Sequence, residues 1–140
     1  MDVSFEITEH RLEERDLKAP FADARSGGFV AFEGWVRNEN EGREVVSLEY
    51  EAYAPLAERE GLRILEEAGE RFRILGAHCA HRVGHLPLGE MAVWVGVSSA
   101  HRSDAFAACR FIIDEVKERV PIWKKEHYGE GDSGWLRSPG

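Results

Sequence analysis

Apolar residues recur at helical spacing in the stretch that follows Pro55. Glu and Arg occupy most positions between them, so that one face is apolar and the other is charged. This period predicts an amphipathic helix, and Pro55 suits its first turn because an N–H at that position has no partner within the helix. The apolar positions are Ala57, Gly61, Ile64, Leu65, Ala68 and Phe72.

A second stretch of helical spacing precedes Pro121. Ser103 or Asp104 is expected to cap its start, since both side chains carry an oxygen that can accept from a free backbone N–H. Pro121 ends the helix because proline cannot continue the hydrogen-bond ladder. The predicted apolar stripe consists of Phe106, Cys109, Ile113, Val116 and Val120.

Five other stretches have the β-branched and aromatic content that is typical of strands. The apolar run of the last one predicts a central strand, and the first one is expected to be a short edge strand. The Asn- and Gly-containing loop between the second and third would allow these two to pair as a hairpin. The stretches are residues 3–7, 27–36, 45–53, 74–83 and 91–99.

Strands that come in pairs with two helices between them indicate an α+β domain with a mixed or antiparallel sheet. The length of 140 residues fits one domain, residues 1–140. Residues 84–90 are expected to form a turn-rich connection. Residues 1–26 are charged and carry few clear signals, and the Gly-rich segment 129–140 is expected to be a mobile or docked tail.

The charge balance limits the partners of the chain. Its net charge is -8, and an acidic chain does not favour nucleic acid, because phosphate neutralisation needs clustered Lys and Arg. The acidic N-terminus lacks the apolar segment of a signal peptide, and no apolar run approaches the ~20 residues that span a membrane. We therefore expect a cytoplasmic protein with no nucleic-acid or membrane partner.

Metal and thiol chemistry have little support in the spacing of the residues. His78, His81 and His85 are close in sequence, but a separation of three in a strand sends His78 and His81 to opposite faces. Cys79 and Cys109 are far apart and fall at apolar positions, which favours buried, inert thiols. We predict no metal site and no cofactor, and no glycine-rich phosphate loop is present.

Cations at the ends of predicted elements are the remaining chemical signal. Arg37 ends a strand, His101 and Arg102 precede a helix N-terminus, where free N–H groups favour anions, and Lys117 lies late in that helix. Each has an ordinary explanation as a surface residue. A lysine held beside other cations and partly desolvated has a depressed pKa, however, and can then accept a proton or bind phosphate. Lys124 and Lys125 follow just past Pro121 beside the apolar Ile122 and Trp123.

Several of these residues fall in segments that resemble a known family. The stretches FEGWVRNENEG, VGVSSAHRSDAFAACRFIIDEVK and VPIWKKE resemble the MoaE family, the large, catalytic subunits of molybdopterin synthase. The likeness covers roughly residues 27–132, and the S-A-H-R and P-x-W-K-K-E motifs at this spacing are specific to it. Residues 1–26 have no clear match.

The resemblance implies a fold and an activity. The fold would be of the α/β hammerhead type with added antiparallel strands. The activity would be that of a sulfurtransferase in molybdenum cofactor biosynthesis, which converts cyclic pyranopterin monophosphate (precursor Z) to molybdopterin. The sulfur would come from the C-terminal Gly-Gly thiocarboxylate of a small ubiquitin-like partner. Two large subunits would form a homodimer with one small subunit at each end, a heterotetramer.

The resemblance also implies roles for individual residues. Lys117 and Lys124 would be catalytic, and either could transfer the proton. The substrate-binding set would be Phe32, Arg37, His101, Arg102, Lys125 and Glu126, with Arg137 matched more weakly because it follows Trp135 at a shorter spacing. His101 and Arg102 would serve the pocket of the neighbouring subunit.

Two alternatives remain open at the level of sequence. One is a non-catalytic module that binds a protein tail in a cationic groove, and the other is an enzyme that acts on a small phosphorylated metabolite without a protein partner. Turnover with a thiocarboxylated partner would exclude the first, and dependence on that partner would exclude the second.

Overall fold

The computed structural model describes residues 1–137 of the chain. Two long helices and a set of strands, most of them antiparallel, form an α+β fold, as the sequence predicts. The elements are β1 (Asp2–Thr8), η1 (Leu12–Glu14), η2 (Ala19–Phe21), β2 (Gly28–Trp35), β3 (Glu39–Asn40), β4 (Arg43–Glu51), α1 (Ala54–Arg71), β5 (Ile74–Arg82), β6 (Gly84–Pro87), β7 (Met91–Ser99), α2 (Arg102–Arg119), β8 (Trp123–Tyr128) and β9 (Leu136–Arg137).

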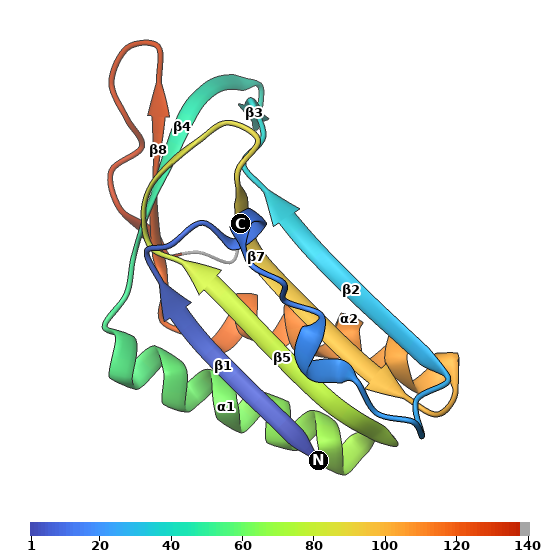
Figure 1. The fold of residues 1–140 in the computed structure, drawn as a ribbon. Helices are drawn as coiled ribbons and strands as arrows, with labels where there is room; N and C mark the ends of the chain where they lie inside the picture. The colour runs from blue at the N-terminus through green and yellow to red at the C-terminus, as the bar shows by residue number, and fades with distance from the viewer. Residues whose placement is uncertain (138–140) are drawn as a thin grey trace.

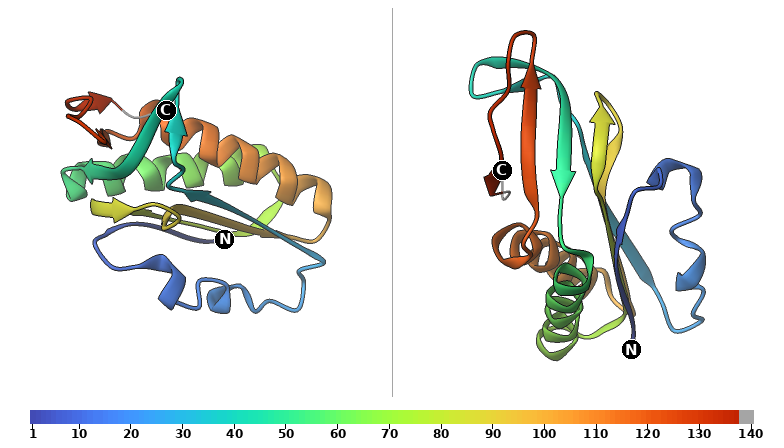
Figure 2. Two further views of the ribbon diagram at one scale, coloured as in Figure 1. Left: turned by 90° about the horizontal axis from the view of Figure 1, so that it is seen from above. Right: turned by 90° about the vertical axis from the view of Figure 1, so that its left-hand side faces the viewer.

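The first sheet has the strand order β1-β5-β7-β2. Strand β1 pairs with β5 in parallel, and the other two pairings are antiparallel. Every residue of β7 is buried, which confirms it as a central strand, and β1 is an edge strand as predicted. Both helices cover one face of this sheet, and the segment with η1 and η2 crosses the other face (Figures 1 and 2). The sheet is therefore the middle of three layers.

The main core fills the space between the two helices and the first sheet. The residues predicted for the apolar face of α1 are buried there, apart from Phe72, which follows the helix and packs edge-on against Phe111. Close contact between α1 and β1 depends on Gly61, because a Cβ at this position would lie 2.3 Å from the Phe5 ring. Any larger side chain would have to displace the Phe5 ring or the helix.

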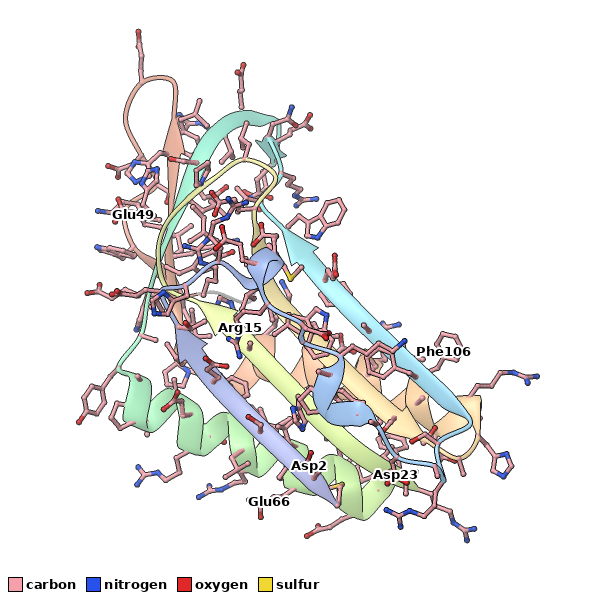
Figure 3. The ribbon with its side chains drawn as sticks, in the orientation of Figure 1. Asp2, Arg15, Asp23, Glu49, Glu66 and Phe106 are labelled. Carbon is pink, nitrogen blue, oxygen red and sulfur yellow. The ribbon has the colours of Figure 1, made fainter. Side chains whose placement is uncertain are left out.

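Helix α2 differs from its prediction in two ways. Phe106 is 61% exposed (Figure 3), because the buried stripe runs through Ala105, Ala108 and Ile112 instead. The helix begins at Arg102, and its N-cap, His101, makes no capping hydrogen bond from its side chain. Asp104 instead accepts from the backbone N–H of Arg73, so it joins α2 to the connection between α1 and β5 rather than capping the helix.

The second sheet stands at one end of the first and is centred on β4. Strand β4 lies between β6 and β8 (Figure 2, right). The predicted hairpin between 27–36 and 45–53 is wrong, because β2 pairs with β7 in the first sheet and β4 turns back on the two-residue β3. The predicted connection 84–90 instead contains β6, an edge strand that pairs with β4.

The C-terminal segment is docked as far as the structure describes it. Strand β9 pairs with β8, and the backbone N–H of Ser133 donates to the Glu126 carbonyl at 2.9 Å. Residues 138–140 of the predicted tail lie outside the described residues. Within residues 1–137, neither helix is long and apolar enough to cross a membrane.

Candidate functional site

A pocket of about 370 Å³ opens where the two sheets meet α2. It brings together residues from β2, β4, β5, β7, α2 and β8, which are far apart in the sequence. Its apolar floor is Val45, Leu48, Ala92, Val93, Ile113 and Val116. Its aromatic and polar wall is Phe32, Glu33, Gly34, Trp35, Arg37, Glu39, Asn40, Tyr50, His81, Lys117, Lys124 and Glu126. Five of the predicted site residues therefore share one pocket: Phe32, Arg37, Lys117, Lys124 and Glu126.

Lys117 reaches this pocket from the last turn of α2. The pKa of its ammonium group is lowered, first because the side chain is partly buried and then because Lys124 and Arg37 are close enough to repel its charge. These are the two causes that the sequence suggested for a depressed lysine pKa. A lysine in this state can exchange a proton more readily than one at the surface.

Lys124 and Glu126 enter the pocket from β8 because alternate residues of a strand share a face. Glu126 is only 4% exposed, and its carboxylate accepts a hydrogen bond from the Asn40 side chain at 3.0 Å. The oxygen of the same Asn40 amide accepts from Arg37 at 3.2 Å. Asn40 thus joins the acidic and basic groups of the wall and holds Arg37 at the pocket.

Tyr50 is a pocket residue that the sequence analysis did not name, and His81 is one that it considered only as a metal ligand. Their rings meet edge-on with centroids 4.9 Å apart. Burial, reinforced by the Glu126 carboxylate, raises the pKa of Tyr50 to about 12. Burial is also the main reason that the pKa of His81 falls to about 4, and Lys117 contributes to the same shift. Both side chains are therefore neutral at pH 7 and line the pocket without adding charge.

The tautomer of His81 follows from its hydrogen bond. Nδ1 lies 2.7 Å from the carbonyl oxygen of Arg82, and a carbonyl can only accept, so Nδ1 carries the hydrogen. No local signal marks His81 or Tyr50 in the sequence, because they come from different strands and meet only when the two sheets come together. The sequence pattern around Asn40 predicts only a loop.

The mouth of the pocket is aromatic. Phe32 and Trp35, both from β2, are 37% and 65% exposed. The register of β2 against β7 shifts between Gly34 and Trp35, and a bulge of this kind re-aims the side chains around it. Gly34 allows the strands to approach here, since a Cβ would lie 2.7 Å from Val93.

The structure does not bring Lys125 or Arg137 into the pocket. Lys125 is on the opposite face of β8 from Lys124, and its ammonium lies 4.5 Å from the centre of the Trp135 ring. Arg137, on β9, donates to the carbonyl of Arg119 at 3.4 Å and stacks over Trp123. Both cations thus contact the outer side of the second sheet.

His101 and Arg102 are also outside this pocket. They are exposed at the N-terminal end of α2, and Lys117 is fifteen residues further along, which corresponds to about 22 Å of helix. The pocket cations and the pair His101 and Arg102 therefore lie at opposite ends of α2.

The cysteines and histidines lie largely as their patterns predict. Cys79 and Cys109 are free and buried, and burial raises the pKa of both thiols, that of Cys109 to about 11. His78 and His81 point to opposite faces of β5, since His78 pairs with Asp2 at 3.0 Å whereas His81 faces the pocket. His85, on β6, stacks near His127 of β8.

Comparisons with known proteins agree on one family. The family model described as MoaE protein matches residues 7–119. A Thermoplasma volcanium protein named molybdopterin synthase catalytic subunit is 45% identical over 130 residues, which cover 93% of this chain and 95% of that protein. The match over so much of both chains includes most of residues 1–26, for which the sequence motifs gave no signal.

Solved structures have the same fold. The crystal structure of molybdopterin synthase from Staphylococcus aureus aligns with a TM-score of 0.88 and 36% identity over 94% of this chain and 96% of that one. A complex of subunits 1 and 2 of the molybdopterin-converting factor from Helicobacter pylori aligns with a TM-score of 0.74 over 91% of this chain and 87% of that one. Its 20% identity shows a likeness of fold alone. From the family match and the relatives together, the chain belongs to the MoaE protein family.

Proposed function

We propose that this chain is the catalytic subunit of a molybdopterin synthase, which converts cyclic pyranopterin monophosphate to molybdopterin. The observation that carries the proposal is the pocket in which Lys117, Lys124 and Arg37 converge in a chain of net charge -8. Three cations that lie close enough for Lys124 and Arg37 to repel the charge of Lys117 suit an anionic group of a substrate, and relatives across most of the chain carry the name of this enzyme.

The sulfur donor is a second protein. Among the described residues that line the pocket there is no cysteine, and both thiols of the chain are buried and held protonated. A thiocarboxylate at the C-terminus of a small ubiquitin-like partner supplies the sulfur instead, and the exposed Phe32 and Trp35 at the mouth of the pocket are suited to contact its tail. The Helicobacter pylori protein is described as a complex of two subunits.

The lysines have distinct roles in sulfur transfer. The partner's sulfur forms a bond to a substrate carbon as a C–O bond at that carbon breaks, and the oxygen leaves as a phosphate oxygen or, once protonated, as water. A second water then attacks the acyl carbon, so that the acyl C–S bond breaks. The sulfur stays on the substrate and the partner is left with a carboxylate. Lys117, with its lowered pKa, takes the proton of the attacking water. Lys124 stabilises the oxyanion that develops at the acyl carbon.

The second group of cations serves another copy of the chain. His101 and Arg102 are exposed and about 22 Å of helix from Lys117, so they cannot act on a substrate bound beside it in the same chain. In a homodimer they bind the phosphate of the substrate in the neighbouring pocket. A two-fold axis makes this exchange reciprocal, and both pockets then become complete together.

The proposal is tested by reconstitution with purified components. The chain is mixed with a thiocarboxylated small partner that ends in Gly-Gly and with cyclic pyranopterin monophosphate, and molybdopterin is quantified. Product should form only with the thiocarboxylated partner, and the same partner with an ordinary carboxylate is the matched control. Absence of product would favour a non-catalytic binding module, and turnover without the partner would favour a small-metabolite enzyme.

The exchange between subunits is tested with mixed dimers. Lys117→Ala and Arg102→Ala chains are each expected to be inactive. When they are co-refolded at equal amounts, half of the dimers are mixed and each of these has one intact pocket, which gives about a quarter of wild-type activity. No recovery in the mixture would contradict the assignment of Arg102 to the neighbouring pocket.

A further inference from the structure

The outer face of the second sheet carries two histidines and a carboxylate that the pocket does not use. Glu49 on β4, His85 on β6 and His127 on β8 each offer one ligand atom, and these atoms lie within 4.8 Å of one another. Glu49 is labelled beside β8 in Figure 3, on the side away from the first sheet. The spacing of the histidines along the chain gave no sign of this cluster, because His127 is remote from His85 in the sequence.

We propose that Glu49, His85 and His127 form a binding site for a zinc-type divalent transition-metal ion. Two imidazoles and one carboxylate are a donor set that Zn²⁺ takes in proteins, with a fourth position for water. A cluster of this kind differs from an acidic patch, since neutral imidazoles select transition metals over Ca²⁺ and Mg²⁺.

Strand pairing holds the three ligands in place. Glu49 is directly opposite His85 in the β4–β6 ladder, and His127 is opposite Ser47, one same-face position along β4. The three side chains therefore stand on one face of three adjacent strands. Because strand β4 bonds to both of its neighbours, the ligands do not depend on a loop for their positions.

The distances between the ligand atoms suit a metal ion that takes the place of the hydrogen between His127 and Glu49. His127 Nε2 lies 2.6 Å from Glu49 Oε1, a contact bridged by one hydrogen, and the rings of His85 and His127 are 5.6 Å apart and inclined by only 32°. Zn–N and Zn–O bonds of about 2.0–2.1 Å would place tetrahedral donors about 3.4 Å from one another. To bind the ion, Glu49 and His127 have to move slightly apart and His85 has to move towards them. Rotations of these exposed or half-buried side chains allow both movements.

The Glu49 carboxylate and the neighbouring lysine contact different partners, His127 and Trp135. Lys125 is the other cross-strand neighbour of Glu49, and an ammonium at the carboxylate would compete with the metal. Its ammonium instead lies over the Trp135 ring. Glu51 is on the same strand face as Glu49, two residues on, and adds negative charge.

A metal at this position would connect the site to the pocket mechanically. It would tie β8 to β4 and β6 on one face, while the other face of β8 carries Lys124 and Glu126. The ion takes no part in the sulfur chemistry, which occurs on the opposite face. Its effect is to stiffen the wall that positions Lys124.

Zinc binding to the full chain without a histidine tag, measured by competition with a chromogenic chelator, tests the proposal. One Zn²⁺ per chain is expected, with binding weakened about tenfold or more in His85→Gln, His127→Gln and Glu49→Gln. His10→Gln is the matched control, because His10 is exposed and is not one of the three ligands, and it should bind as the wild type does. Equal affinities in His85→Gln and His10→Gln would overturn the proposal.

Thermal unfolding gives a second reading that also detects variants that fail to fold. Zn²⁺ should raise the Tm of the wild type and of His10→Gln, since a ligand that binds only the folded state stabilises it. Mg²⁺ should have no such effect. His85 is exposed, so His85→Gln should unfold at the wild-type Tm without metal and should not respond to Zn²⁺. A Zn²⁺-induced rise of the same size in His85→Gln would overturn the site.

Discussion

Lys124 and Lys125 are adjacent and chemically identical, yet they belong to different environments. Lys124 faces the pocket, where Lys117, Arg37 and the buried Glu126 surround it. Lys125 faces the outer side of the second sheet and lies over the Trp135 ring. The pleat of one strand therefore separates a pocket with three converging cations from a surface with histidines and a carboxylate. A motif read as K-K-E conceals this division, because the letters do not record the face on which each residue stands.

The same contrast applies to burial and charge. The pocket face changes the protonation of its groups, lowering the pKa values of Lys117 and His81 and raising that of Tyr50. The outer face arranges Glu49 and His127 as a hydrogen-bonded pair between half-buried side chains. Desolvation is thus the main influence on one face, and direct pairing is the main influence on the other.

The largest expected effect is on the pocket face. Lys117→Ala should lower the rate of molybdopterin formation by about 10²–10⁴-fold, the usual range for loss of a proton-transfer group. Single-turnover kinetics with thiocarboxylated partner would measure it. Near-normal turnover in both Lys117→Ala and Lys124→Ala would contradict the assignment of catalysis to these lysines.

The direct comparison is between two neighbouring substitutions. Lys124→Ala should lower the rate about 10²-fold or more, because it removes the positive charge that stabilises the developing oxyanion. Lys125→Ala should stay within about threefold of wild type, since it acts on the other face. An equal loss in both variants, measured in the same assay, would mean that the two faces are not functionally separate.

The pH dependence of stability should report the buried histidine of the pocket. The folded pKa of His81 is about 4, below the ordinary value of 6.5 for a histidine, so the folded state resists its protonation. The contribution of the neutral His81 to the free energy of unfolding is fully present above pH 6.5. It is lost as the pH falls towards 4. Between pH 7 and pH 5 the loss is about 2 kcal/mol.

Chemical denaturation at several pH values would measure this dependence. His81→Gln should have a flatter profile over the interval, whatever its stability at pH 7. His10→Gln, at an exposed position, should keep the wild-type slope. A wild-type slope in His81→Gln would show that other groups cause the acid sensitivity.

The smallest expected effect concerns the contact between Lys125 and Trp135. An exposed cation–π pair contributes about 0.5–1 kcal/mol, so Lys125→Met should lower the free energy of unfolding by no more than about 1 kcal/mol. Molybdopterin formation should be unchanged. Urea unfolding of Lys125→Met beside Lys124→Met would show whether the two lysines also differ in their contribution to stability.

Sequence patterns could predict the elements whose buried face follows from their own periodicity. Helix α1 lies with its predicted residues inward, and the apolar run of β7 is central. The pairing of the strands was harder to predict, because β2 and β4 are close in sequence but belong to different sheets. Phe106 was misplaced because small residues such as Ala105 and Ala108, which a search for large apolar groups overlooks, make the buried stripe.

The candidate site was predictable only in part, for a similar reason. The family resemblance identified the five charged or aromatic residues that share the pocket. It could not identify Tyr50, His81 and Asn40, whose positions depend on how two sheets meet. It also could not assign the face of Lys125, because the start and register of β8 decide that face.

The pairing of β4 with β8 has a consequence for how the protein is made. Strand β8 is the last contributor to the pocket, and its partner β4 is synthesised much earlier. A nascent chain can begin to form its first sheet and helices while the second sheet still lacks β8. Such distant pairings form slowly, so the ability to bind substrate should appear only near the end of folding. Until then β4 has an unpaired edge that could bind another chain.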